Sequence, residues 1–362
     1  MKKKYILTAA LIALLGITYF SIISPIYKSY KDANIIRNFA EDSENVFVNT
    51  FHGIFKINKK TNQISEINFL TRKIVVDEND EKWLISYDTL YSFKNENKIL
   101  THNSNFNQLG FEQTDIMWWD LTIDQFGTKW IFVDKSGSVE ELYSYNNNTW
   151  QKHHIPRETV DLHSQHEIFI DKSGNICLPS NKMFSSSYHE KDGSKSTFIN
   201  FTNHLLILDN PTLWEPASEN DTIWKPMWTK IDFETKFTLD KSFNDRNNNI
   251  WFAGTFDGKN TLYRFEYPDF VKYDLDKGIK AIASDKEENI WIATEVGIEK
   301  LNDKKTFIEK KGITDMFIDS NNKIWIECYN SHKLECYDGK EWKSYNYEIF
   351  KLVLKEFFSQ LF

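Results

Sequence analysis

The chain has 362 residues and a formal net charge of −8 at pH 7, and 27% of its residues are charged and 15% aromatic. This length and aromatic content suit one large domain with a packed core and exclude a mainly disordered chain. The negative charge argues against a nucleic-acid-binding protein, because contacts to phosphate need a basic face.

Residues 1–30 have the pattern of an export segment. Lys2, Lys3 and Lys4 precede an uncharged stretch that runs from Tyr5 to Tyr27. A positive start followed by an apolar segment directs export with the N-terminus kept inside, and this stretch is long enough to span a bilayer. We therefore expect a signal-anchor that holds the remaining chain in the periplasm or at the cell exterior. A cleaved signal peptide, which would release a secreted protein, is the alternative.

Residues 34–347 repeat one pattern, in which an acidic residue stands six positions before an aromatic residue. The clear copies are Asp77/Trp83, Asp124/Trp130, Asp245/Trp251, Asp285/Trp291 and Asp319/Trp325. The weaker copies are Glu41/Phe47, Asp171/Cys177 with cysteine in the aromatic position, and Asp209/Trp214 with one residue fewer. The eight anchors lie 36, 47, 47, 37, 37, 40 and 34 residues apart, which leaves room for four short strands in each copy.

Four-stranded units that repeat at this period with Trp at a fixed place are typical of a β-propeller. We therefore predict an all-β chain with a single propeller over residues 34–347, in which each motif Trp packs against a neighbouring blade. The acidic residue should accept backbone N–H bonds in the turn between the first and second strands. Eight anchors favour eight blades. A seven-bladed ring stays open, with the weak copy at Trp214 as an insertion, and a β-sandwich is the remaining alternative.

Candidate ligand-binding residues lie in and after the third repeat. Trp118, Trp119 and Asp120 fall in a first strand, which should line the central channel. Because side chains alternate along a strand, one of the two Trp residues should face the channel and stack on a sugar or aromatic ligand, unless both pack between blades. His163 and His166 are added as candidates from the following connection. An extended strand would separate these two rings, so we expect no metal, no cofactor and no catalytic residue.

Cys328 and Cys336 flank the corner between the second and third strands of the last repeat. Antiparallel strands can bring such residues together, and an exported chain permits a disulfide. The cross-strand register cannot be derived from the sequence, so a disulfide and two thiols both stay open.

Residues 348–362 depart from the β pattern. Ile349, Leu352, Val353, Phe357 and Leu361 recur at helical spacing opposite a polar stripe. This spacing predicts a C-terminal amphipathic helix that packs against the propeller, with docking to a membrane surface or a partner as the alternative.

Three stretches carry a resemblance to a known family. Asp245–Gly254 (DRNNNIWFAG), Asp285–Thr294 (DKEENIWIAT) and Asp319–Glu327 (DSNNKIWIE) resemble the two-component-regulator propeller repeat, whose pattern is roughly D-x-x-G-x-I-W-x-G-T. The resemblance covers residues 34–347 in uneven copies. It implies an exported propeller of the kind that forms the sensory part of hybrid histidine kinases. Neither a kinase nor a β-sandwich module is expected in this sequence, so the resemblance implies no signalling output.

The sequence contains no phosphate-binding loop and no nucleophile elbow. We therefore expect a non-enzymatic, membrane-anchored, extracytoplasmic propeller that binds a small molecule, a glycan or an envelope protein through loops on one face. The membrane contact would come from the N-terminal helix, and no nucleic acid is expected. Two alternatives are a lyase or hydrolase related in style to streptogramin lyases, and a scaffold for cell-envelope assembly.

Overall fold

The computed structural model describes the backbone of most of residues 35–345, and for some strand residues only the backbone. The described ranges are 35–51, 53–86, 89–95, 98–102, 116–135, 139–153, 167–189, 195–208, 214–216, 224–226, 228–232, 237–266, 269–301, 303–328 and 333–345. All regular elements in these ranges are strands, and none of these residues forms an apolar helix of membrane-spanning length. The expected signal-anchor (1–30) and the expected C-terminal helix (348–362) lie outside the described residues.

The described residues form seven four-stranded antiparallel sheets, which we call blades 1 to 7. Blade 1 contains β1 (Ile36–Glu41), β2 (Asn45–Thr50), β3 (Gly53–Asn58) and β4 (Ile64–Ile67), and blade 2 contains β5 (Lys73–Val76), β6 (Lys82–Ser86), β7 (Thr89–Phe93) and β8 (Leu100–His102). Blade 3 contains β9 (Ile116–Ile123), β10 (Lys129–Lys135), β11 (Val139–Asn146) and β12 (Thr149–His153), and blade 4 contains β13 (Phe169–Ile170), β14 (Ile176–His189), β15 (Lys195–Leu208) and β18 (Trp228–Asp232). Blade 5 contains β19 (Phe237–Asn244), β20 (Ile250–Phe256), β21 (Lys259–Glu266) and β22 (Asp269–Asp274), and blade 6 contains β23 (Ala281–Ser284), β24 (Ile290–Ala293), β25 (Gly297–Lys300) and β26 (Asp303–Glu309). Blade 7 contains β27 (Ile313–Ile318), β28 (Ile324–Cys328), β29 (Lys333–Tyr337) and β30 (Trp342–Tyr345).

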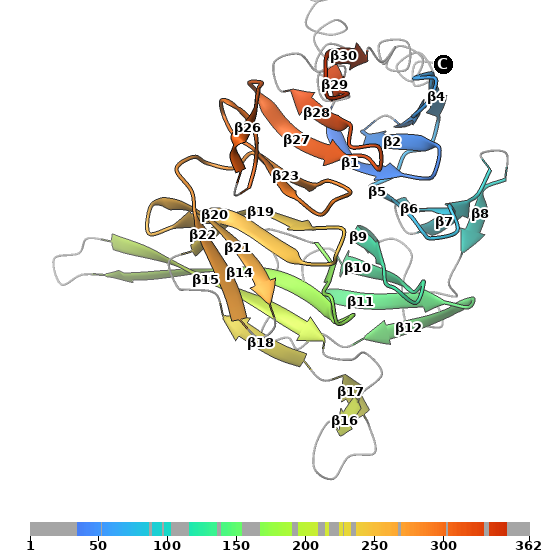
Figure 1. The fold of residues 1–362 in the computed structure, drawn as a ribbon. Helices are drawn as coiled ribbons and strands as arrows, with labels where there is room; N and C mark the ends of the chain where they lie inside the picture. Colours follow the sequence, from blue (N-terminus) through green and yellow to red (C-terminus); the bar gives the residue numbers. More distant parts are fainter. Residues whose placement is uncertain are drawn as a thin grey trace, which may run out of the picture.

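The blades close into a ring (Figure 1). Seven hydrophobic clusters lie in the described residues, and each joins two consecutive blades. One of them packs Trp325 and Leu334 of blade 7 against Val46 and Phe55 of blade 1, so the last blade meets the first. This closed ring of four-stranded sheets is a β-propeller. A single sheet cannot bury both of its faces, and stacking the sheets around an axis covers them.

The expectation of eight blades is wrong. Trp214, the fifth anchor, lies in a separate two-stranded hairpin of β16 (Trp214–Pro216) and β17 (Trp224–Pro226), which is inserted between β15 and β18. The fourth and sixth anchors, Cys177 and Trp251, lie 74 residues apart, and this interval holds the rest of blade 4 with the inserted hairpin and then the first strand of blade 5. The extra residues of blade 4 lie in β14 and β15, which have 14 residues each, and in the added hairpin.

The repeated acidic residue has two hydrogen-bonding roles in its turn. In blade 7, Asp319 accepts the backbone N–H of Asn321 at 2.8 Å and of Lys323 at 3.0 Å through Oδ1, as predicted. Its Oδ2 accepts the indole N–H of Trp325 at 3.0 Å, which explains the spacing of six residues. The same indole bond forms in four other blades, at Trp83, Trp130, Trp251 and Trp291.

The turn also contains a residue with positive φ, three positions after the acidic residue. These residues are Asp80, Gly127, Gly174, Asn248, Glu288 and Asn322. Asn, Asp and Gly tolerate this left-handed conformation best, which accounts for their frequency there. In blade 1 the turn carboxylate is Asp42 rather than the expected Glu41, since Asp42 accepts the backbone N–H groups of Glu44 and Asn45.

The packing prediction for the aromatic position is confirmed. Trp83 of blade 2 packs with Leu121 and Ile131 of blade 3, and Trp251 of blade 5 packs with Ile282 of blade 6. Cys177 takes the same place in blade 4 and packs with residues of blade 5. Each blade therefore contacts the next one through the same strand position.

Of the two states left open for Cys328 and Cys336, the structure has two free thiols and no disulfide. The two residues lie on neighbouring strands, but Cys328 is opposite Lys333 and Cys336 is opposite Trp325. An offset of three positions along a strand is about 10 Å, beyond the reach of a disulfide. The two side chains also pack in different clusters, Cys328 against blade 6 and Cys336 against blade 1.

Candidate functional site

The first strands of the blades lie toward the centre of the ring, where β1 contacts β5, β5 contacts β9, and β19 and β27 each contact β23 (Figure 1). On the first strand of each of these blades, one residue pairs with a particular residue of the second strand. That partner lies two positions after the motif anchor of the same blade. The residues at this position are Asn38, Lys73, Asp120, Lys241, Ala281 and Asp315. In blade 4, Glu167 stands two residues before Phe169, which pairs with the anchor Cys177. We call these seven residues the hub ring.

The hub ring is rich in ionisable side chains. Five of its seven members are ionisable, and they come from blades 2, 3, 4, 5 and 7. In four blades the strand has a register irregularity just before the ring residue, at Arg37, Trp119, Asp240 and Thr314. An extra residue of this kind bends a strand and re-aims the side chains that follow, and it is common next to functional sites.

Asp120 links three blades. It forms an ion pair with Lys73 of blade 2, and its Oδ2 accepts the backbone N–H of Ile168, which precedes β13, at 2.7 Å. Asp120 is only 2% exposed, so this carboxylate is almost fully removed from water. Burial opposes the charge of Lys73, but the carboxylates of Asp120 and Glu167 outweigh it and raise the pKa of the Lys73 amine.

Glu167 continues the network into blade 5. Its Oε2 accepts a hydrogen bond from the hydroxyl of Ser242. Burial raises the pKa of Glu167, and the nearby Asp120 carboxylate adds to the rise, against the opposing charge of Lys73. Lys73, Asp120 and Glu167 thus form a continuous charged arc.

Two carboxyl groups sit side by side in blade 7. Asp315 and Glu327 are cross-strand partners, so their side chains leave the same face of the sheet. Burial raises the pKa of Asp315 to about 6 and also raises that of Glu327. Glu327 accepts the hydroxyl of Thr314 at 2.9 Å and the backbone N–H of Ile36 at 3.2 Å, so it also ties blade 7 to blade 1.

An arginine bridges the turn-side end of the hub. Arg246, in the first turn of blade 5, donates to Glu41 of blade 1 at 2.9 Å and to the backbone oxygen of Ile318 in blade 7 at 2.8 Å. Lys59 of blade 1 binds the same Glu41 at 2.6 Å. These contacts cross the ring at the end where the first turns lie.

The chemistry of the hub is that of polar recognition. Its carboxylates are Asp120, Glu167, Asp315 and Glu327, and its amines are Lys73 and Lys241, which leaves an excess of acidic groups. Within the described residues, no three His, Cys, Asp or Glu side chains converge as metal ligands.

The sequence-based candidates are only partly covered by the structure. Asp120 lies in the hub ring, whereas Trp118 and Trp119 are described through the backbone of β9 alone. His163 and His166 lie outside the described residues. The roles proposed for these five residues stay predictions.

Sequence reasoning missed the other charged hub residues, although a signal was present. Lys73, Asp120, Glu167, Lys241 and Asp315 each stand ten positions before the anchor of their own blade. A polar residue at a constant offset inside an otherwise apolar strand is a detectable pattern. The pattern is missed when each strand is considered alone, because a single charged residue in a short strand is not unusual.

The chain has structural counterparts among known proteins. No family model and no curated protein matches the chain. Among solved structures, it is similar to the extracellular domain of the one component system BT4673 from B. thetaiotaomicron, at 13% identity and a TM-score of 0.26. That match covers 85% of this chain and 54% of the other, so the chain spans about half of that structure's length.

Two further structures are matched over more of their length. The calcium-binding protein regucalcin from Agrobacterium tumefaciens is 11% identical with a TM-score of 0.44, over 82% of this chain and 83% of that one. The Dos1 propeller is 12% identical with a TM-score of 0.46, over 86% of this chain and 77% of that one. At such identities the likeness concerns the fold alone.

Proposed function

We propose that the protein is an extracytoplasmic binding propeller, held at the membrane by its N-terminal segment, that recognises a small polar ligand at the hub without transforming it. The observation that supports this most strongly is the hub ring, in which ionisable groups from five blades occupy equivalent places around one axis. Propellers bind ligands at such central positions because loops and strand ends of all blades converge there.

The carboxyl pair of blade 7 indicates the chemistry of the ligand. Packing alone does not account for Asp315 beside Glu327, because two like charges in a desolvated place oppose folding. Burial raises the pKa of both groups, against the opposing charge of Lys241, so keeping the two groups charged carries a cost in stability. A ligand that donates hydrogen bonds, in particular one with an amine, would offset it, so we assign an amine-bearing or hydroxyl-rich small molecule to the hub.

The binding test uses the purified full chain in detergent and a thermal-shift titration with glucosamine, with glucose as the uncharged comparison. We expect a larger shift with glucosamine, and its loss in the double variant Asp315→Asn/Glu327→Gln. The control is Lys340→Gln, an exposed residue in an outer turn of blade 7. An unchanged shift in the double variant, or chemical conversion of the sugar, would overturn the proposal.

The location test is protease digestion of intact cells compared with lysed cells. An extracytoplasmic propeller with an N-terminal anchor should stay with the membrane fraction. It should be digested by the protease once the outer cell envelope is opened, while the inner membrane is still intact. Protection until the inner membrane is broken would contradict this placement.

A protein partner is the second candidate, and one observation favours it. The β14–β15 hairpin pairs over 14 residues on each strand, whereas β18 pairs with β15 only from His204 to Leu208 (Figure 1). Residues 181–189 and 195–203 therefore form a two-stranded arm beyond the blade. Such arms gain stability by contact with another surface. A stoichiometric partner that copurifies with the full chain, and is lost when the arm is shortened to its blade 4 portion, would support an assembly scaffold.

A further inference from the structure

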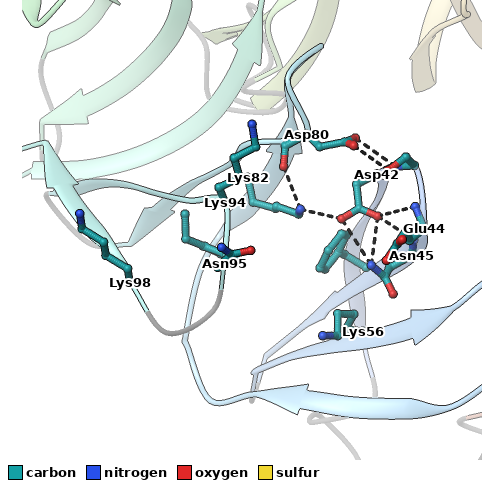
Figure 2. Close-up of a pocket in the computed structure, with 12 residues that line it drawn as sticks. Asp42, Glu44, Asn45, Lys56, Asp80, Lys82, Lys94, Asn95 and Lys98 are labelled. Carbon is teal, nitrogen blue, oxygen red and sulfur yellow. Dashed lines mark hydrogen bonds and ion pairs between the residues drawn. The ribbon is translucent and has the colours of Figure 1, made fainter.

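A pocket of about 650 Å³ lies between blades 1 and 2, away from the hub ring. It is formed by the first turn of blade 1, by Asp80 and Lys82 of blade 2, and by the end of β7 with the following turn (Figure 2). No member of the hub ring lines it. Its volume is within the range of small-molecule sites and exceeds that of a simple packing defect.

Two of the three acidic groups that line this pocket are already engaged by the protein. Asp42 pairs with Lys82 at 2.6 Å, and both residues are nearly buried, at 8% and 5% exposure. Asp80 accepts the backbone N–H of Ser43 at 3.0 Å and its hydroxyl at 2.6 Å. Burial opposes the charge of Asp42, but the bond from Lys82 and the backbone N–H bonds lower its pKa overall, and the Ser43 bonds lower that of Asp80. Both carboxylates therefore stay charged and satisfied.

The mouth of the pocket, in contrast, presents amines. Lys94 and Lys98 are exposed in the turn after β7, and neither forms an ion pair within the described residues. Lys56 of β3 lies on the other side of the pocket, and Glu44 is the third lining acid (Figure 2). In total four lysines and three acids line the pocket, in a chain whose net charge is −8. The lining therefore carries one more amine than carboxylate, although the chain as a whole is acidic.

Neutral hydrogen-bonding groups complete the wall. The amides of Asn45 and Asn95 lie on opposite sides of the mouth (Figure 2), and the almost fully buried rings of Phe47 and Phe93 also line the pocket. Lysines favour an anionic group, while amides and hydroxyls match the hydroxyls of a sugar ring. We propose that this pocket binds a small polyhydroxylated carboxylate, such as a sugar acid, with its carboxylate held by Lys94 and Lys98.

The test is calorimetric titration of the purified full chain with glucuronate. Glucose is the matched ligand without a carboxylate, and inorganic sulfate is the anion without hydroxyls. We expect glucuronate to bind at least tenfold more tightly than either. Lys94→Gln/Lys98→Gln should weaken glucuronate binding at least tenfold, and Glu44→Gln should strengthen it several-fold because a like charge is removed.

Matched controls keep the result specific. Lys340→Gln removes one exposed lysine from the corresponding turn of blade 7 and should leave binding unchanged. The hub variant Asp315→Asn/Glu327→Gln should also bind glucuronate normally, so failure of the hub proposal does not affect this one. No glucuronate binding, equal binding of sulfate or glucose, or an equal loss in Lys340→Gln would overturn the inference.

Discussion

Trp325 donates its indole N–H to Asp319 at 3.0 Å, and neither residue exposes any surface to solvent. The bond joins the first turn of blade 7 to the side chain that packs against blade 1. One local contact thus orients the residue that closes the ring.

The first prediction concerns this bond. Trp325→Phe keeps an aromatic ring but removes the donor and leaves a buried carboxylate oxygen unpaired. We expect the free energy of unfolding to fall by about 2–4 kcal/mol, from the unpaired oxygen and the lost volume. Denaturant unfolding measures it. Trp291→Phe is the comparison, because Trp291 makes the same bond but is partly exposed. Equal losses in the two variants would show that burial of the bond is not the cause.

The second prediction concerns a close backbone approach in blade 6. A Cβ atom on Gly297 would lie 2.5 Å from the backbone oxygen of Ile308 and 2.6 Å from the ring of Phe307. Gly297→Ala must therefore separate β25 from β26 and should cost about 1–3 kcal/mol of stability. At Gly278 the nearest atom would be the Asn260 side-chain oxygen at 3.4 Å, so Gly278→Ala should change stability by less than about 0.5 kcal/mol. Thermal unfolding that ranks the two variants in the opposite order would refute this reading.

The third prediction concerns pH and Asp315. Burial raises its pKa to about 6 in the folded protein, above the ordinary aspartate value of 3.8. The charged form therefore opposes folding, and this destabilisation is present above pH 6 and is lost as the pH falls toward 4. Asp315→Asn should thus stabilise the protein at pH 7.5 by about 1–3 kcal/mol, with a gain that shrinks to nothing near pH 4.

Unfolding curves recorded from pH 4 to pH 8 measure this gain. Asp269→Asn, an exposed carboxyl on β22, serves as the control and should show no such trend. A gain from Asp315→Asn that stays constant over this range would mean that the charge of Asp315 is not the cause.

The fourth prediction concerns the cysteines. Burial raises the pKa of the Cys328 thiol to about 11 and that of the Cys336 thiol to about 12. In the native protein at pH 8 these buried thiols should react with a thiol reagent far more slowly than an exposed cysteine. After denaturation without reductant, all three cysteines should react. A count of one would show that Cys328 and Cys336 are bonded.

The sequence predicted the repeated blade unit much better than it predicted the candidate site. Asp120 was selected because it follows two Trp residues, whereas its partners in the structure are Lys73 and the backbone of Ile168. Lys73 stands 47 residues earlier and Ile168 stands 48 residues later. Nothing local to Asp120 indicates either contact, because they arise only when the three first strands meet at the axis.

The sequence by itself determined the repeated unit, since the turn carboxylate, the left-handed residue and the anchoring indole lie within seven consecutive residues and interact through short-range geometry. Only the tertiary structure decided how many units join the ring, that Trp214 belongs to an inserted hairpin, and that Cys328 and Cys336 face different blades. Strand register and the meeting of the first strands depend on contacts between residues tens to hundreds of positions apart. Spacing along the chain does not encode such contacts, so the meeting of the hub charges at the axis and the lysine pocket became visible only in the folded protein.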